Sequence, residues 1–184
     1  MIDTKKIEQA TTMLLEGLGV DLTDHNFAKT PQRVARVYAE LFAPPDVEIP
    51  VFDENFTDMV VMRRHEFYTL CPHHMLPVKI TASVAYLPNG KVIGASKLMR
   101  MMHDVNRGPM TQEALTAAIV QRVRDLTEAH SRGEAAILRG EHGCFRIRGV
   151  RSHCADMVTS RFSGEFRQQP ELQTQFFRMV GELR

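Results

Sequence analysis

Apolar residues recur at helical spacing in the first third of the chain, which predicts two helices there. The first covers residues 4–19 and ends at Gly19. The second begins at Thr30, which can serve as its N-cap, with Pro31 at the first helical position, where a missing N–H costs little. The apolar stripes consist of Ile7, Ala10, Leu14 and Leu18 in the first helix and Val34, Val37, Tyr38 and Leu41 in the second.

The segment that follows these helices has a different composition. Residues 43–58 are rich in Pro, Asp and Glu and are predicted to form a linker or surface loop. The chain is therefore expected to divide into an N-terminal helical region with its linker, residues 1–58, and a larger domain, residues 59–184.

In the larger domain, segments with the two-residue period of strands flank two segments with the helical period. The order of two strands, two helices and two strands predicts an α+β fold, a compact sheet with both helices on one face. Ser96 can cap the first of these helices. The strands are expected over residues 78–87, 91–94, 135–138 and 144–150, and the helices over 96–105 and 111–129.

Charge and cysteine content restrict the class of protein. Lys+Arg number 23 and Asp+Glu 22, so no global field attracts nucleic acid or an anionic membrane. The sequence shows no cleavable signal pattern and no apolar run of about eighteen residues. Three cysteines, an odd number, do not describe a disulfide framework and suit a reducing cytosol. We therefore expect a cytoplasmic protein that binds neither nucleic acid nor membrane.

Two short clusters of cysteine and histidine carry the clearest chemistry, and they lie about seventy residues apart. Cys71 and His74 have a C-x-x-H spacing that lets a tight turn aim both side chains at one point. Cys144 can complete a zinc site with three protein ligands, which leaves a position open for water. His73 and His142 then remain free to move protons, so the pattern predicts a catalytic zinc site.

A plainer interpretation exists for each of these residues. A single C-x-x-H arises by chance in many chains, and a lone cysteine is usually a small buried hydrophobe. The second cluster, with its own Cys and His, argues against chance. Cys154 has His153 beside it but no partner spacing, and it is interpreted as an ordinary reduced cysteine.

The predicted last strand sets an expected distance between the metal site and a nearby arginine. Side chains alternate along a strand, so Cys144, Arg146 and Arg148 would share one face. Cys144 and Arg148 would then lie about 13 Å apart. A metal at one end and a guanidinium at the other suit a long substrate with an anionic end, such as a nucleoside triphosphate.

Other polar residues are candidates for contacts with such a substrate. Ser96 and Lys97, with Arg100, stand at a predicted helix start, where free N–H groups favour phosphate. The side chains of Gln112 and Glu113 can read the edge of a purine. Arg33 and Arg36 form a small basic spot one helical turn apart. The alternative for all these residues is a solvated position with no ligand.

Six segments spread between Gly17 and Arg178 together resemble one family. They are Thr30-Pro31-Gln32-Arg33-Val34-Ala35, Glu66-Phe67-Tyr68 leading to Cys71-x-His73-His74-x-Leu76-Pro77, Val84-Ala85-Tyr86-Leu87-Pro88, Val92-Ile93-Gly94-x-Ser96-Lys97, Gln112-Glu113-x-Leu115-Thr116 and His142-x-Cys144-x-x-x-Arg148-Gly149. In this order they resemble the GTP cyclohydrolase I family. The resemblance implies a tunnelling fold, an antiparallel four-stranded sheet with two helices on one face, preceded by N-terminal helices. It also implies a homo-oligomer, usually a decamer of two pentameric rings, with active sites between subunits.

The same resemblance implies a role for each matching residue. Cys71, His74 and Cys144 would bind zinc, and His73 and His142 would act as acid and base. Gln112 and Glu113 would hold guanine; the ribose and triphosphate would be bound by Arg33, Arg36, Ser96, Lys97, Arg100 and Arg148. The implied reaction converts GTP and water into formate and 7,8-dihydroneopterin triphosphate. Pro72 departs from the pattern, since a glutamate usually stands between the cysteine and the first histidine.

Two other functions stay open at this point. The chain could be a divergent tunnelling-fold relative that acts on another purine nucleotide or stops at a formamide intermediate. It could also be a non-catalytic assembly protein that zinc stabilises.

Overall fold

A computed structural model describes residues 2–43 and 48–181, which fall into two compact units. The first unit consists of α1 (Thr4–Gly17) and α2 (Thr30–Phe42), which pack on each other. The N-cap of α2 is Lys29 and not Thr30, because the helix begins one residue earlier than predicted. The predicted stripe of α1 is largely uncovered within this unit, with Leu14 61% exposed and Leu18 68% exposed.

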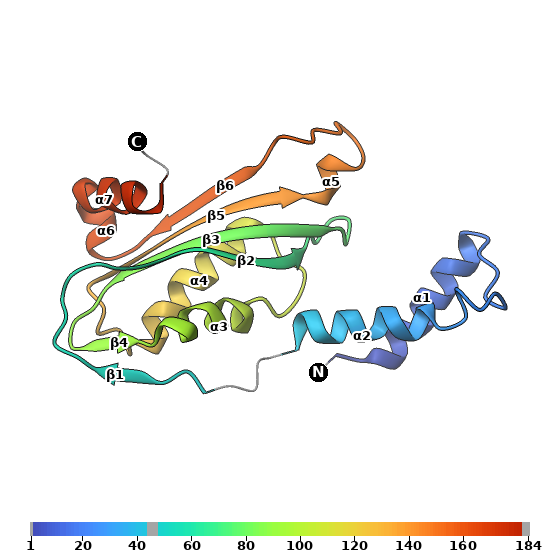
Figure 1. Ribbon diagram of the computed structural model, residues 1–184, viewed down its shortest axis with the longest axis horizontal. Helices are drawn as coiled ribbons and strands as arrows, with labels where there is room; N and C mark the ends of the chain where they lie inside the picture. Colours follow the sequence, from blue (N-terminus) through green and yellow to red (C-terminus); the bar gives the residue numbers. More distant parts are fainter. Residues whose placement is uncertain (1, 44–47, 182–184) are drawn as a thin grey trace. The chain divides into compact units, whose positions relative to one another are not determined.

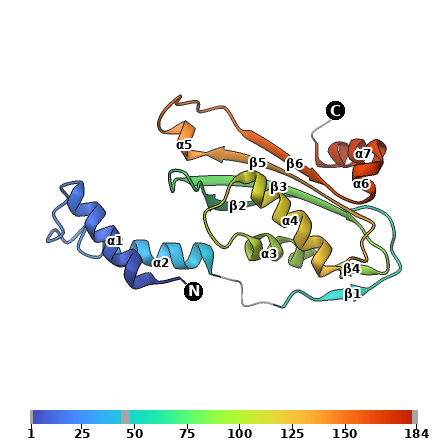
Figure 2. The same ribbon diagram turned by 180° about the vertical axis from the view of Figure 1, so that it is seen from behind.

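The second unit is built on an antiparallel sheet with the strand order β2-β3-β5-β6. The two helices that lie between β4 and β5 in the chain cover the same face of the sheet, as the two opposite views show (Figures 1 and 2). This arrangement confirms the predicted α+β class, a four-stranded antiparallel sheet with two helices on one face and helices before it. The strands are β2 (Val60–Leu70), β3 (Pro77–Leu87), β5 (Gly133–His142) and β6 (Met157–Phe162), and the helices are α3 (Ala95–Val105) and α4 (Gln112–Leu126).

Apolar side chains fill the space between the sheet and these helices. Ile80 and Leu138 from the sheet pack in one buried cluster with Met102, Leu115 and Ile119 from the helices. A second cluster joins the sheet to the C-terminal helices α6 (Glu165–Gln168) and α7 (Pro170–Val180). The sheet is therefore buried over much of both faces, which explains why β3 carries apolar residues at successive positions near its end.

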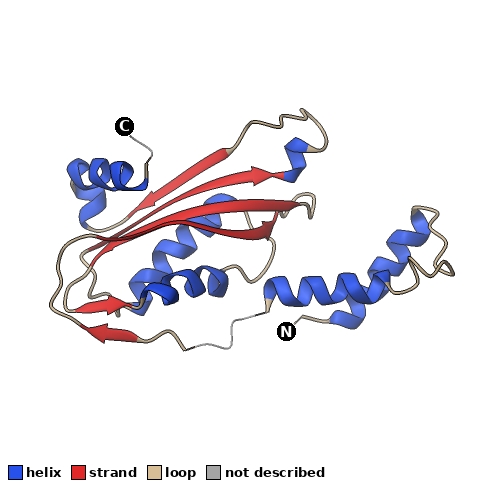
Figure 3. Cartoon of the chain, in the orientation of Figure 1, coloured by secondary structure: helices blue, strands red, loops and turns tan. Residues whose placement is uncertain are grey.

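Several strands differ from the prediction (Figure 3). β4 (Lys91–Ile93) forms, but it pairs with β1 (Val51–Asp53) in a separate two-stranded sheet. Residues 51–53, predicted as loop, are thus part of a strand. The long strand β2 was not predicted, because charged residues interrupt its apolar positions and a register shift lies between Met62 and His65. The domain boundary at residue 58 stays a prediction.

The predicted strand over residues 144–150 is wrong. The chain there forms a short helix, α5 (Gly143–Arg146), and the fourth strand of the sheet is β6. A Cβ on Gly143 would lie 2.9 Å from the carbonyl oxygen of Pro77, so the chain passes very close to the start of β3. The chain leaves the sheet at this close approach, which the local sequence does not reveal.

Candidate active site

The first part of the site is the tight turn that joins β2 to β3. The backbone N–H of Cys71 donates to Leu76 O at 2.9 Å, and that of Met75 donates to Cys71 O at 2.9 Å. Met75 adopts a φ of 55°. Pro72, which has no N–H to satisfy, suits the early position of a turn. The turn buries the Cys71 side chain and leaves His73 and His74 exposed.

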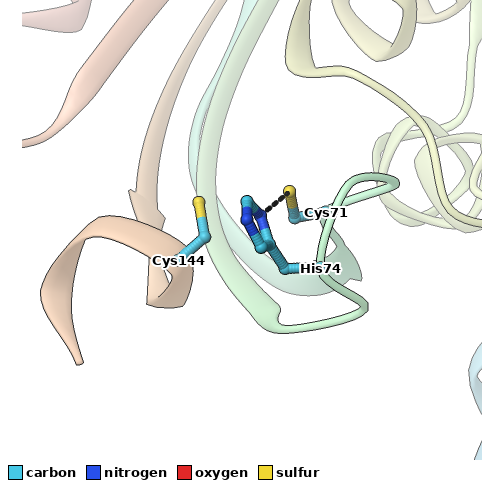
Figure 4. Close-up of side chains that lie close together, drawn as sticks. All are labelled: Cys71, His74 and Cys144. Carbon is cyan, nitrogen blue, oxygen red and sulfur yellow. Dashed lines mark hydrogen bonds between the residues drawn. The ribbon is translucent and has the colours of Figure 1, made fainter. Parts of the chain in front are cut away.

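The second part of the site is α5, which follows β5 directly. The register of β5 places His142 opposite Val78, at the start of β3 and beside the turn. The chain continues through Gly143 to Cys144, so the end of β5 delivers this thiol to the turn. Figure 4 shows Cys71 and His74 rising from the turn and Cys144 from α5, into the same space.

Three of the predicted ligands therefore meet. One ligand atom from each of Cys71, His74 and Cys144 lies within 4.8 Å of the others, and these residues form the one such group found in the described part of the chain. The Nδ1 atom of His74 lies 3.9 Å from Cys71 Sγ. His73 Nδ1 lies 3.7 Å from the same sulfur, although His73 is not a member of the group.

The chemistry of these donors fits zinc. Two thiols and one imidazole match the donor types that zinc prefers, and three protein ligands leave a position open. Burial raises the pKa of the Cys144 thiol, as do the hydrogen bond and charge of Cys71, while Arg148 lowers it in part. Two adjacent thiolates repel each other, so a bound cation would favour the deprotonated form that binds metal.

Arg148 lies beside the group of Cys71, His74 and Cys144, and not at the far end of a bound nucleotide as predicted. Its Nη1 atom lies 2.7 Å from His74 Nε2, and Nδ1 is the ring nitrogen on the side of Cys71. The predicted separation of about 13 Å assumed a strand and is wrong, because α5 coils the chain back. Arg146 binds Glu141 at 2.6 Å, at the end of β5.

His142 is held by a buried side chain from the start of α4. His142 Nε2 lies 2.8 Å from Gln112 Oε1, and Gln112 is 3% exposed. Burial lowers the pKa of His142, and the negative charge of Glu113 raises it in part. The structure thus brings both Gln112 and Glu113 to the end of the sheet that carries the thiols. Glu113 itself is exposed.

The predicted phosphate-binding residues do not join this group. Ser96, Lys97 and Arg100 lie in the first turns of α3, whose N-cap is Gly94 and not Ser96. Figure 1 shows the start of α3 beside β4, at the opposite end of the sheet from α5. Arg33 and Arg36 belong to α2 in the N-terminal unit, which is described by itself.

Gly140 contributes to the site and was not among the candidates. It lies in β5 two residues before His142, where the absence of a Cβ leaves room for the Gln112 side chain. A glycine inside a strand often marks a close approach of another group. The predicted strand ended at residue 138, so this signal becomes visible only because β5 extends to His142.

The fold and the donors together define an α+β protein with a Cys2His group suited to a divalent metal. A family model described as GTP cyclohydrolase I matches residues 7–181. The chain belongs to the GTP cyclohydrolase I family and is thereby a GTP cyclohydrolase by class, which confirms the resemblance.

Individual relatives agree over nearly their whole length. A GTP cyclohydrolase 1 of Clostridium perfringens is 34% identical over 185 residues, covering 98% of this chain and 99% of its own. That of Sulfurihydrogenibium sp. is 36% identical over 182 residues, with 98% and 96% covered. That of Bacillus subtilis is 36% identical over 172 residues, with 90% of each covered. Among the described residues, no helix is both long and apolar enough to traverse a bilayer.

Proposed function

We propose that this chain hydrolyses the imidazole ring of the guanine in GTP, releases formate and forms 7,8-dihydroneopterin triphosphate, with zinc as its cofactor. The observation that carries the proposal is the meeting of Cys71, His74 and Cys144 beside His142, in a chain of this family. Zinc held there would supply a water whose pKa is lowered to about 7.

The two histidines outside the metal group would move protons. Carbon C8 of guanine is a poor electrophile until N7 is protonated. His142, a partly buried imidazole two residues before Cys144, could supply this proton from Nδ1 in its imidazolium form while Nε2–H stays on Gln112. His73, on the exposed side of the turn, would serve the proton transfers at the ribose that rearrange the sugar carbons. The exposed amine then closes the new ring.

The remaining predicted residues would hold the substrate in place. The exposed carboxylate of Glu113 can accept from the ring N–H and the exocyclic amine of guanine together. The triphosphate is not altered in the reaction, so its cationic partners would convert binding energy into orientation of the ring. These partners are Ser96, Lys97, Arg100, Arg148, Arg33 and Arg36.

A homo-oligomer would complete the site. Ser96, Lys97 and Arg100 lie at the end of the sheet away from the thiols, so one protomer does not surround a whole nucleotide with them. In the described part of the sheet, β2 and β6 are edge strands with one side unpaired, which suits continuation of the sheet into a neighbouring copy. We propose a decamer of two pentameric rings in the cytoplasm. A stable monomer in active fractions at low concentration would contradict shared sites.

The direct test is incubation of the purified protein with GTP and zinc. Oxidation of the product should give neopterin fluorescence, with one formate released for each pterin. Loss of GTP with neither formate nor pterin released would instead indicate a relative that stops at a formamide intermediate. No reaction with GTP but reaction with another purine nucleotide would indicate a different substrate. If His142→Ala or His73→Ala keeps both zinc and full turnover, the acid and base assignment is wrong.

A further inference from the structure

The amide of Gln112 has only one orientation that satisfies its surroundings. Its Nε2 atom donates to the carbonyl oxygens of Leu138 at 3.0 Å and Met157 at 2.9 Å. It also lies 3.1 Å from Thr159 Oγ1. Carbonyl oxygens only accept hydrogen bonds, so the NH2 group must face them and Oε1 must face the other way. Rotating the amide by half a turn would set its oxygen against two carbonyl oxygens.

This orientation determines which nitrogen of His142 carries hydrogen. Gln112 Oε1 lies 2.8 Å from His142 Nε2, and an amide oxygen can only accept. The hydrogen must therefore be on Nε2, and in the neutral ring the lone pair must be on Nδ1. The ring of Phe145 stacks on that of His142, with centroids 5.6 Å apart and planes at 24°, which fixes the ring plane as well.

We propose that Gln112 is a positioning residue that holds His142 as the Nε2–H tautomer and so presents Nδ1 to the reacting atoms. The tautomer follows from the contacts alone, whereas its use in turnover rests on the proposed function. Gln112 reaches guanine only through His142 under this proposal. Its side chain is buried and both of its polar atoms already have protein partners, which leaves guanine recognition to the exposed Glu113 beside it.

Gly140 is the second part of this arrangement. A Cβ at this position would lie 2.0 Å from Gln112 Oε1 and 2.9 Å from His142 Nε2. Any other residue would push the amide and the imidazole apart. A glycine within β5 is thus required by the Gln112–His142 contact and not by the strand itself, in which glycine is unfavourable.

The test uses Gln112→Met, which keeps the length of the side chain but removes both the donors and the acceptor. The matched control is Glu134→Gln, an isosteric change of another buried polar residue, which lies in β5 at the opposite end from His142. Solid-state 15N spectra of histidine-labelled protein report the tautomer at any oligomer size, and His142→Gln identifies the signals. Wild type and Glu134→Gln should show His142 protonated at Nε2, and Gln112→Met should show a mixture of tautomers.

Kinetics then separate positioning from recognition. The substrates are GTP and inosine triphosphate, which lacks the 2-amino group. For both, Gln112→Met should lower kcat about 10²-fold and leave KM within about threefold of the wild-type value for the same substrate. Gly140→Ala should lower kcat in the same way, because its Cβ would separate Gln112 from His142. This second variant keeps the proposal testable if Gln112→Met does not fold. Glu134→Gln should match wild type.

Two results would overturn the proposal. One is a wild-type His142 protonated at Nδ1. The other is a Gln112→Met enzyme whose KM rises for GTP but not for inosine triphosphate at unchanged kcat, since this would make Gln112 a direct guanine contact. If wild type has no cyclohydrolase activity, the proposed function fails, and the 15N spectra still decide whether Gln112 sets the tautomer.

Discussion

The two segments that bring Cys71, His74 and Cys144 together are built in different ways. The turn of residues 71–76 closes with its own backbone hydrogen bonds between Cys71, Met75 and Leu76, and it joins two strands that pair along their length. By contrast, α5 is a four-residue helix, held where Gly143 meets Pro77 and where Arg146 binds Glu141. The turn thus closes through its own hydrogen bonds, whereas α5 also has a contact with Pro77, which is distant in the sequence.

The largest expected effect comes from removing the ligand that α5 supplies. Cys144→Ser should lose most of the bound zinc and lower turnover on the order of 10³-fold, because the metal-activated water is lost. Zinc content by atomic absorption and the GTP assay measure both. Cys154→Ser is the matched control, since Cys154 is exposed and outside the metal group, and it should retain zinc and activity. A Cys144→Ser protein with full zinc and full turnover would remove α5 from the site.

The sequence predicted the turn and the three residues that meet there, Cys71, His74 and Cys144, because C-x-x-H spacing and a second Cys are visible in the sequence itself. It also predicted β3, α4 and the position of the helices on one face. It failed for α5, since Cys144 to Arg148 alternates like a strand and the approach of Gly143 to Pro77 is not visible in the local sequence. Local propensity is a weak guide where a tertiary contact of this kind intervenes.

A second change tests whether that approach places α5. In Gly143→Ala the new Cβ would lie 2.9 Å from Pro77 O, a backbone atom that cannot move aside cheaply. We expect a loss of about 1–3 kcal/mol in the free energy of unfolding. Displacement of Cys144 should also weaken zinc binding about 10–100-fold. Denaturant unfolding and competition with a zinc chelator measure the two.

The control for this change is Gly108→Ala. A Cβ added at Gly108 would meet no atom of the described residues within 4 Å, and the φ of Gly108 is not positive, so alanine should be tolerated there. If Gly143→Ala binds zinc as tightly as Gly108→Ala does, the contact with Pro77 does not place the thiol, and α5 would be as locally determined as the turn.

The turn can be tested through its proline, with a smaller expected effect. Pro72→Ala keeps the backbone hydrogen bonds of the turn but gives the unfolded chain more freedom, which should cost about 0.4–1 kcal/mol. Zinc affinity should stay unchanged, because the folded turn is the same. A Pro72→Ala protein that unfolds normally but loses zinc would show that this turn, too, depends on more than its hydrogen bonds.

The smallest expected effect compares one ion pair from each segment. Glu141→Gln removes the charge that pairs with Arg146, 2.6 Å away, in the ion pair that ties α5 to the end of β5. Glu66→Gln removes the charge that pairs with Lys79, 2.9 Å away on the β2–β3 hairpin. Both pairs are partly exposed, so each change should cost less than about 1 kcal/mol, and the cost should shrink at high salt. Only Glu141→Gln should weaken zinc binding, by about twofold to threefold. The Glu141–Arg146 pair holds α5, which is not a strand of the sheet, whereas the Glu66–Lys79 pair joins two strands that are already hydrogen-bonded to each other. Equal zinc affinities in the two variants would mean that packing at Gly143 alone places Cys144, and the ion pair would then add stability without positioning the ligand.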